Sequence, residues 1–302
     1  MTAPRPTPLP VAFAAGALGI ALFSGMDAVM KGMTLAMGVY NAMLWRFAAI
    51  FVMTAILYFA QRPKMPGRDA LRFHVIRGMV TVVMALLFFW GLARVPMAQA
   101  IALCYIAPLL ALGLAALLLK EKVGREVIGP SLLAIAGVAV ILLGQSRSQM
   151  GDEALLGTIA IIGSAVCYSY NIILMRQQAL VAGPAEISFF QSLIVGGFLL
   201  LAAPWLAALP PTDQVAPILL AAALATGSLW LMSWAYARAE ANYLAPTEYT
   251  SFVWAALFGW LVFGEHVPPY TLAGAALIVT ACVLAARRKP GLVAHDTEAA
   301  LP

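Results

Sequence analysis

The chain has 302 residues, of which 63% are hydrophobic and only 10% are charged, and its mean hydropathy is +0.92. An ordinary soluble domain carries about 25% charged residues, so this composition excludes a soluble globular protein. A helix needs about twenty successive apolar residues to cross a bilayer, and the chain offers that length repeatedly. It is therefore predicted to be an all-α integral membrane protein.

Ten apolar segments follow one another along the chain. They are expected at residues 10–30, 38–60, 73–93, 97–119, 126–144, 154–176, 186–208, 215–237, 243–263 and 270–287. The loops between them are short, the longest lying near 60–73, so none can fold as a separate catalytic domain. The N-terminal stretch MTAPRPTPLP has no cleavage-type pattern, and the first span is expected to be retained.

The sequence contains few residues that could form a metal site, a cofactor site or an enzyme active site. The cysteines all fall inside expected spans, where they read as small buried residues: Cys104, Cys167 and Cys282. The histidines lie at helix ends or in the tail, and neither an HExxH pattern nor a phosphate loop occurs. We expect no cofactor, no metal and no intramembrane enzyme, and an ion channel would lack a recognisable filter.

The positive charge is distributed as membrane orientation requires. With the N-terminus inside, 14 of the 18 Lys and Arg residues fall on the cytoplasmic side, three fall outside and Arg46 lies within a span. Positively charged loops remain cytoplasmic, so both termini are predicted to be cytoplasmic. The net charge of +5 is explained in this way, and no nucleic-acid partner is expected.

A short signature occurs twice. Residues 90–94 read WGLAR and residues 234–238 read WAYAR, an offset of 144. The same offset places Tyr105 on Tyr249 and Glu121 on Glu265. The sequence thus predicts two repeats of five helices, and because five is odd the second enters the membrane inverted. Inverted repeats around a midplane site are a common construction of secondary transporters; chance similarity between two Ala/Leu-rich halves is the alternative.

The predicted organisation follows from this repeat. It comprises a cytoplasmic tail at 1–9, the first five-helix repeat at 10–144, an outer linker at 145–153, the second repeat at 154–287 and a cytoplasmic tail at 288–302. The halves are expected to enclose a central cavity.

Two closing segments carry a family resemblance. They read YIAPLLALGLAALLLKEKVGREVIGPSLLAIAGVAVILLG at 105–144 and TSFVWAALFGWLVFGEHVPPYTLAGAALIVTACVLAARR at 250–288. A glutamate turn at Glu121 or Glu265 is followed by a helix opened by Gly129 or Gly274. This pattern resembles the EamA-type branch of the drug/metabolite transporter superfamily and, more finely, the YddG-type exporters of aromatic amino acids. The resemblance implies a transporter of the bacterial inner membrane whose partners are the lipid bilayer and a small solute.

The sixth span presents polar side chains along one face. Ser164, Tyr168 and Asn171 follow one another at spacings of four and three residues, which aligns them on a helix. Polar groups facing lipid are costly, so the stripe is expected to face a cavity, or else to form interhelical hydrogen bonds.

Aromatic residues supply the remaining cavity candidates. In the eighth span Trp230 and Trp234 share a face, and Trp90 is the repeat counterpart of Trp234; belt anchoring is the alternative for such tryptophans. In the ninth span Tyr249 and Phe252 are candidates, opposite Tyr105 and Pro108 of the fourth. Pro108 removes one backbone hydrogen bond from its helix, which predicts a ligand contact or a hinge, with plain packing as the alternative.

Few charges lie inside the expected spans. Asp27 and Lys31 form an i, i+4 pair on the face of Ser24, and we expect a solvated pair near the outer end, with recognition of an amino acid's charged groups as the alternative. A structural pair with Asp27, or snorkelling, accounts for Arg46. Glu248 is the carboxylate nearest a helix centre and the first candidate for coupling or gating. The glutamates at helix ends, Glu121 and Glu265, are expected to form turns.

The sequence predicts a secondary transporter that exports small neutral amino acids or metabolites, foremost aromatic amino acids, by alternating access. The sparse midplane charge favours facilitated exchange. The alternative is the same fold exporting another solute, such as a small polar amino acid, a nucleoside-like metabolite or a cationic drug, with proton coupling through Glu248. The oligomeric state is left open, with a monomer among the alternatives.

Overall fold

The computed structural model describes residues 9–60, 65–119, 128–147, 151–236, 238–239 and 241–286. Within these residues every regular element is a helix, and seven helices are long and apolar enough to cross a membrane. The predicted class of all-α membrane protein is therefore confirmed. The expected count of ten spans stays a prediction, and Glu121 and the two tails lie outside the described residues.

The first half of the chain contains two interrupted helices. Its elements are α1 (Leu9–Ala60), α2 (Arg68–Leu92), α3 (Met97–Cys104), α4 (Ala107–Leu119) and α5 (Ile128–Arg147). Gly38 divides α1 into two helices, because its φ of 79° and ψ of 155° are not helical. Between α3 and α4 the chain makes shorter turns, in which the Ile106 N–H donates to the Leu103 carbonyl at 3.3 Å. Pro108, two residues further on, cannot donate a backbone hydrogen bond.

The second half repeats this order, and the counterpart of the α3–α4 segment is one continuous helix. Its elements are α6 (Gly151–Ala179), α7 (Pro184–Leu201), the short α8 (Ala203–Leu206), the 3₁₀ helix η2 (Thr212–Gln214), α9 (Val215–Tyr236), α10 (Ala241–Phe263) and α11 (Pro269–Ala286). Adding 144 to the bounds 97 and 119 of the α3–α4 segment gives 241 and 263, the bounds of α10. The fourth expected span therefore corresponds to the ninth.

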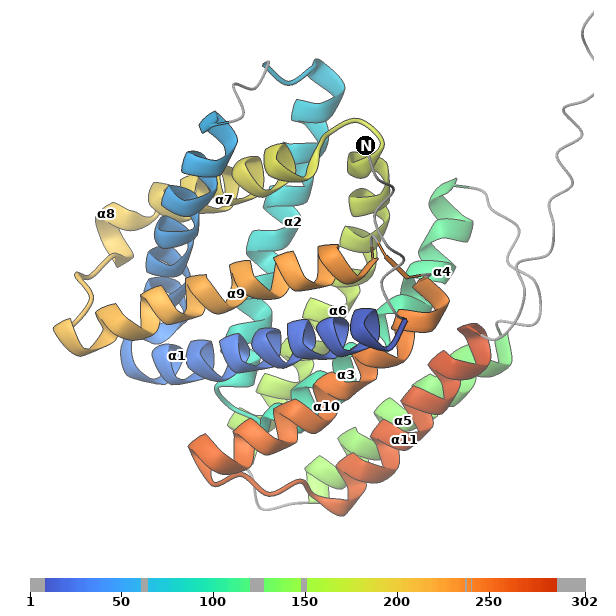
Figure 1. Cartoon of the computed structure of the whole chain (residues 1–302). Helices are drawn as coiled ribbons and strands as arrows, with labels where there is room; N and C mark the ends of the chain where they lie inside the picture. Colours follow the sequence, from blue (N-terminus) through green and yellow to red (C-terminus); the bar gives the residue numbers. More distant parts are fainter. Residues whose placement is uncertain are drawn as a thin grey trace, which may run out of the picture.

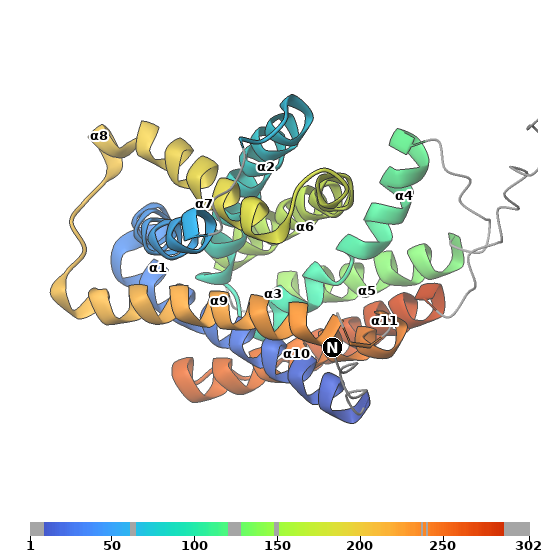
Figure 2. The same ribbon diagram turned by 45° about the horizontal axis from the view of Figure 1, so that its top comes forward.

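The main helix pairings join one half to the other. The most extensive are α1 with α9, α2 with α6, and α5 with α11 (Figures 1 and 2). In the repeat, α6 is the counterpart of the first part of α1, α9 is the counterpart of α2, and α11 is the counterpart of α5. Exchanging the two halves therefore converts the pair α1–α9 into the pair α6–α2 and leaves the pair α5–α11 unchanged. The pairing thus has the two-fold pattern expected of two related repeats.

Repeat counterparts run antiparallel. On α5 and α11, Gly144 lies against Tyr270, whereas Gly137 lies against Gly274 and Ile278, so the numbering rises on one helix as it falls on the other. The second part of α1 and α7 behave alike: Tyr40 donates to the Leu199 carbonyl at 2.6 Å, and the hydroxyls of Thr54 and Ser192 are 2.8 Å apart. Two halves related by inversion in the membrane require this arrangement.

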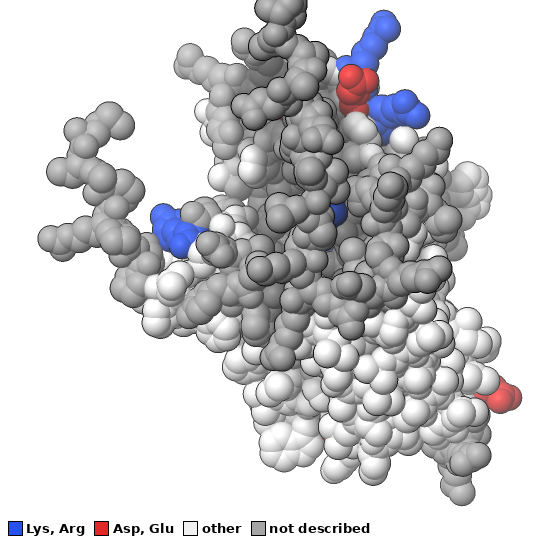
Figure 3. Space-filling model, turned by 90° about the vertical axis from the view of Figure 1, so that its right-hand side faces the viewer, with Lys and Arg blue, Asp and Glu red and all other residues white. Residues whose placement is uncertain are grey.

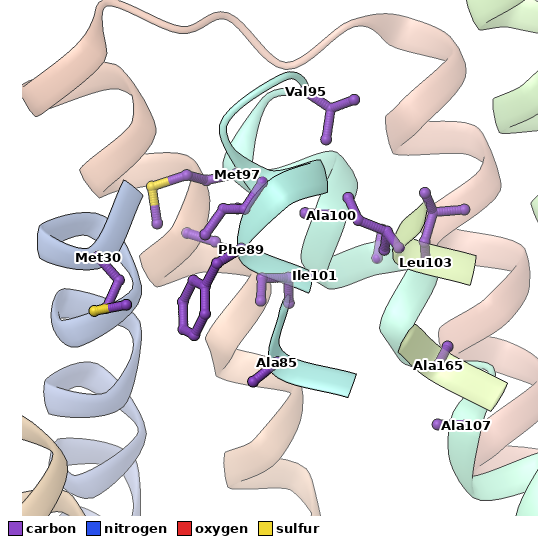
Figure 4. Packing of buried hydrophobic residues seen from close by; sticks show 14 of the residues in the cluster. Met30, Ala85, Phe89, Val95, Met97, Ala100, Ile101, Leu103, Ala107 and Ala165 are labelled. Carbon is purple, nitrogen blue, oxygen red and sulfur yellow. The ribbon is translucent and has the colours of Figure 1, made fainter. Parts of the chain in front are cut away.

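The core is built from buried residues of both halves, and Ala165 of α6 is one that comes from the second half. Figure 4 shows Met30 of α1, Phe89 of α2, and Met97 and Ile101 of α3 packed together, each at most 9% exposed. Beyond this core the surface is apolar. In Figure 3 the lower part of the described surface is uncharged apart from an acidic side chain at its edge, as a lipid-facing surface requires.

Candidate functional site

In both copies of the Trp–Arg signature, the arginine contacts the ring and the carbonyl of the tryptophan near the end of a helix. The Arg94 guanidinium lies 3.6 Å from the centroid of the Trp90 ring and donates to the Trp90 carbonyl at 3.1 Å. Arg238 repeats this with Trp234, at 4.3 Å to the ring and 3.2 Å to the carbonyl. Arginines near helix C-termini commonly satisfy the last carbonyls. These contacts support a structural role for Trp90 and Trp234, and their place among the cavity residues stays a prediction.

Two repeat counterparts meet where α3 ends beside α10. The rings of Tyr105 and Tyr249 contact edge to face, with centroids 5.5 Å apart. The Tyr105 hydroxyl lies 2.7 Å from the Ser251 hydroxyl and accepts the Phe252 N–H at 2.9 Å. The Tyr105 carbonyl, at the break before α4, accepts the Cys282 thiol at 3.2 Å. The predicted pairing of the two tyrosines is present, and both rings are half-buried.

Tyrosines from four helices surround one exposed carboxylate. Tyr236, at the end of α9, donates its hydroxyl to Glu248 Oε1 at 2.9 Å. The phenols of Tyr105, Tyr168 and Tyr249 lie close enough to interact electrostatically with Glu248. These residues come from the end of α3 and from α6, α9 and α10. None of the ion pairs among the described residues includes Glu248, so its carboxylate is free to meet a cationic group. We call these four tyrosines and Glu248 the tyrosine site.

A polar network lies beside the tyrosine site, between α2 and α6. The Arg77 guanidinium donates to Asn171 Oδ1 at 3.2 Å and to Gln178 Oε1 at 2.5 Å, and it interacts electrostatically with Tyr168. Gln178 continues the network to His74 at 2.6 Å. Asn171 is therefore a buried partner that orients an arginine, and Tyr168 interacts electrostatically with both Arg77 and Glu248.

A different arrangement closes the opposite end of α10. The Lys31 ammonium, almost fully buried, pairs with Glu265 and donates to the Val95 carbonyl at 2.6 Å. The second carboxylate oxygen of Glu265 accepts the Met97 N–H at 2.8 Å, at the N-terminus of α3. A carboxylate is stabilised there by the helix dipole and an unpaired N–H. We call these contacts the Lys31 latch.

The latch corrects two expectations. Lys31 is not part of a solvated pair with Asp27, because both side chains are buried and Lys31 is bound to Glu265. Glu265 does more than form a turn, since it joins α1 and α3 of the first half to the second half. The sequence could not indicate this pairing because its partners are 234 residues apart.

Asp27 lies about one helical turn before Lys31 and Ser24 about two turns before it, and both side chains are in the interior. Asp27 is 1% exposed, and within the described part of the chain neither of its carboxylate oxygens has a hydrogen-bond partner; the same holds for the buried Ser24 hydroxyl. Arg46 interacts electrostatically with Asp27, but among the described residues the two form no ion pair, so the predicted structural pair stays a prediction. The Arg46 guanidinium lies 5.4 Å from the Phe89 ring centroid, and its Nε has no hydrogen-bond partner among the described residues.

The remaining candidates are dispersed. Ser164 is buried and donates to the Met84 carbonyl at 2.8 Å, which is the interhelical alternative. Trp230 is 58% exposed on α9, and Pro108 is exposed in the first turn of α4. An apolar groove of about 440 Å³ lies between α2, α4 and α6, near Tyr170. Its walls suit a hydrocarbon chain better than a polar solute.

Sequence reasoning missed Tyr236 and Arg77. Tyr236 stands at the end of an expected span, where aromatic residues usually anchor the helix. Arg77 was counted among the cytoplasmic charges, although it lies inside the expected span 73–93. An arginine within a span is itself a signal of a buried polar partner. Among the described residues, no three His, Cys, Asp or Glu come together as metal ligands.

The chain belongs to the EamA-like transporter family, whose profile matches residues 11–143 and again residues 155–287. The two matches are offset by 144 residues (155 − 11 and 287 − 143), the offset of the sequence repeat. The protein is thus a multi-pass membrane transporter built from two copies of one unit.

Individual relatives transport different solutes. A pseudopaline exporter of Pseudomonas aeruginosa is 27% identical over 89% of this chain and 93% of its own length. A riboflavin transporter of Rhizobium johnstonii is 31% identical over 90% of this chain and 89% of its own. A solved crystal structure, 22% identical, matches 93% of this chain and 100% of its own with a TM-score of 0.59; this likeness supports the fold alone.

Proposed function

We propose that this protein exports small zwitterionic metabolites, foremost aromatic amino acids, across the bacterial inner membrane, with both termini cytoplasmic. The observation that carries the proposal is the exposed, unpaired Glu248 carboxylate surrounded by tyrosines of four helices. A solute ammonium would bind Glu248, and its aromatic ring would lie against the phenols, where ring pairs add about 0.5–1.5 kcal/mol beyond area burial. Arg77, in electrostatic range of Tyr168, would attract the solute carboxylate.

Alternating access follows from the arrangement of the halves. The Lys31 latch closes one end of the interface, and the tyrosine site is accessible in this same conformation. Rocking of the halves would break the latch and close the tyrosine site from its present side.

The test is transport in proteoliposomes. Purified protein is expected to exchange labelled Trp and Phe faster than labelled Thr. Glu248→Gln keeps the shape of the side chain but removes its charge, and the loss of a charged hydrogen bond of about 1.5–3 kcal/mol should weaken Trp binding about tenfold to a hundredfold. The matched control is Glu153→Gln, which alters an exposed glutamate paired with Arg94. Unchanged Trp affinity in Glu248→Gln would refute the assignment.

A second candidate is export of another solute with a cationic group, with Glu248 as its counter-ion and, in a proton-coupled cycle, as the proton carrier. The same free carboxylate favours it, since Glu248 forms no ion pair among the described residues. Relatives named for pseudopaline export and S-adenosylmethionine uptake illustrate the range of solutes in the family. Competition of labelled Trp by a panel of amines and amino acids separates the two candidates: inhibition by simple amines alone favours the second.

A further inference from the structure

The strongest unexplained feature of the molecule is the buried Asp27. Its side chain is 1% exposed, and neither carboxylate oxygen has a hydrogen-bond partner among the described residues. Ser24, one turn earlier on α1, has a buried and unpaired hydroxyl as well. An ionised carboxylate in such a place loses its hydration without compensation, at a cost of several kcal/mol. A neutral carboxylic acid avoids most of that cost.

The groups that face Asp27 from the packed elements are few. Arg46, on the second part of α1, interacts electrostatically with Asp27, but its guanidinium donates to the Met26 sulfur at 3.5 Å and lies over aromatic rings. The Cys104 thiol at the end of α3 is the other titratable group in electrostatic range. The Lys31 ammonium, one turn along α1, is held by Glu265.

The other helices packed on α1 bring no free charge to Asp27. The sequence of α9 contains no Asp, Glu, Lys or Arg. On α10, Glu248 is not among the groups that interact electrostatically with Asp27, and on α7, Glu186 lies against His74. On α2, Arg77 is held by the side chains of α6. Among the described residues, therefore, no group forms a hydrogen bond or an ion pair with Asp27 that would hold it ionised while the Lys31 latch is closed, and Arg46 acts on it only electrostatically.

We propose that Asp27 is a proton-binding site linked to the Lys31 latch, which makes the protein a proton-coupled exporter. With the latch closed, the Asp27 carboxyl holds one proton as an O–H bond. When Glu265 separates from Lys31, water enters, the O–H bond breaks, and the proton passes to that water. The freed ammonium, four residues along the same helix face, then pairs with the ionised carboxylate. One proton is taken up and one released in each cycle, and no other reactant is needed.

Protonation of Asp27 can be tested without any solute. Infrared difference spectra of the purified protein, titrated from about pH 5 to about pH 9, should contain a carboxylic-acid band that decreases as the pH rises. The band should be absent in Asp27→Asn and unchanged in Asp69→Asn, which alters an exposed carboxylate at the start of α2. Asp27→Glu, which retains the acid, should shift the band rather than remove it, and this variant serves if Asp27→Asn does not fold. A spectrum without such a band, or a band unaffected by either Asp27 substitution, overturns the proposal.

Coupling rests on the transport proposed above and is measured separately, as labelled Trp accumulated in proteoliposomes under a pH gradient. One proton per solute supports up to about tenfold accumulation for one pH unit. Asp27→Asn should reduce this to equilibration, a ratio of about one, while exchange of labelled for unlabelled Trp continues. Undiminished accumulation in Asp27→Asn overturns the coupling. If the wild-type protein moves no Trp yet shows the Asp27 band, the assigned solute is wrong and the proton site stands.

Discussion

Glu265 and Glu248 belong to the same half of the protein, yet the fold treats them in opposite ways. Glu265 is largely buried, and its two oxygens receive the Lys31 ammonium and the Met97 N–H. Glu248 is exposed and receives the Tyr236 hydroxyl, and it belongs to none of the ion pairs that the described residues form. A carboxylate whose oxygens are bound by protein groups holds elements together, whereas a carboxylate left accessible can bind a ligand. Glu265 therefore belongs to the closed end of the interface between the halves, and Glu248 belongs to a site that is open to a ligand.

The largest effect is expected from breaking the latch. Lys31→Met keeps the length of the side chain but leaves Glu265 without its cation. Removing one partner of a buried ion pair typically costs about 3–5 kcal/mol, and that cost falls on the conformation in which the latch is closed. Thermal unfolding in detergent should show a clear loss of stability. If Lys31→Met unfolds at the same temperature as the wild-type protein, the assignment of the Lys31 latch is wrong.

A smaller effect is expected where the halves are joined by packing rather than by charge. A Cβ atom added at Gly137 would lie 2.7 Å from the Gly274 carbonyl oxygen on α11. Overpacking of this kind costs about 1–3 kcal/mol, so Gly137→Ala should unfold at a lower temperature. The matched control is Gly196→Ala on α7, where an added Cβ meets nothing within 4 Å. Equal stability of the two variants would contradict the close approach of α5 and α11.

At the tyrosine site, Tyr105→Phe removes a hydroxyl that contacts Ser251 and accepts the Phe252 N–H. Each such bond contributes about 0.5–1.5 kcal/mol, so a loss of about 1 kcal/mol in the free energy of unfolding is expected. Tyr236→Phe leaves the Tyr105 contacts intact, and the Trp affinities of the two variants are to be compared. If Tyr105→Phe were more disruptive than Lys31→Met, the tyrosine site rather than the latch would dominate the joining of the halves.

The smallest effect is expected at the surface pair Arg94–Glu153, whose carboxylate is 79% exposed. Exposed ion pairs contribute about 0.2–1 kcal/mol. Glu153→Gln should therefore unfold close to the wild-type temperature, and the remaining difference should shrink in high salt. A loss as large as that of Lys31→Met would mean that burial does not distinguish these two pairs.

The sequence by itself determined the membrane class, the family resemblance and the repeat. Hydropathy is a local property of each segment, and the 144-residue offset is visible in side chains such as Trp90 and Trp234. Even the meeting of Tyr105 with Tyr249 was predictable, because two-fold related residues on facing helices approach their common axis.

Only the tertiary structure decided what the charged residues do. Lys31, Arg77 and Glu265 carry the same local signal, a charge in or near an apolar span, yet each found a partner on a distant helix. Asp27 was buried without one. The energy of a charge depends on which groups replace its lost hydration, and those groups are brought near only when the helices pack.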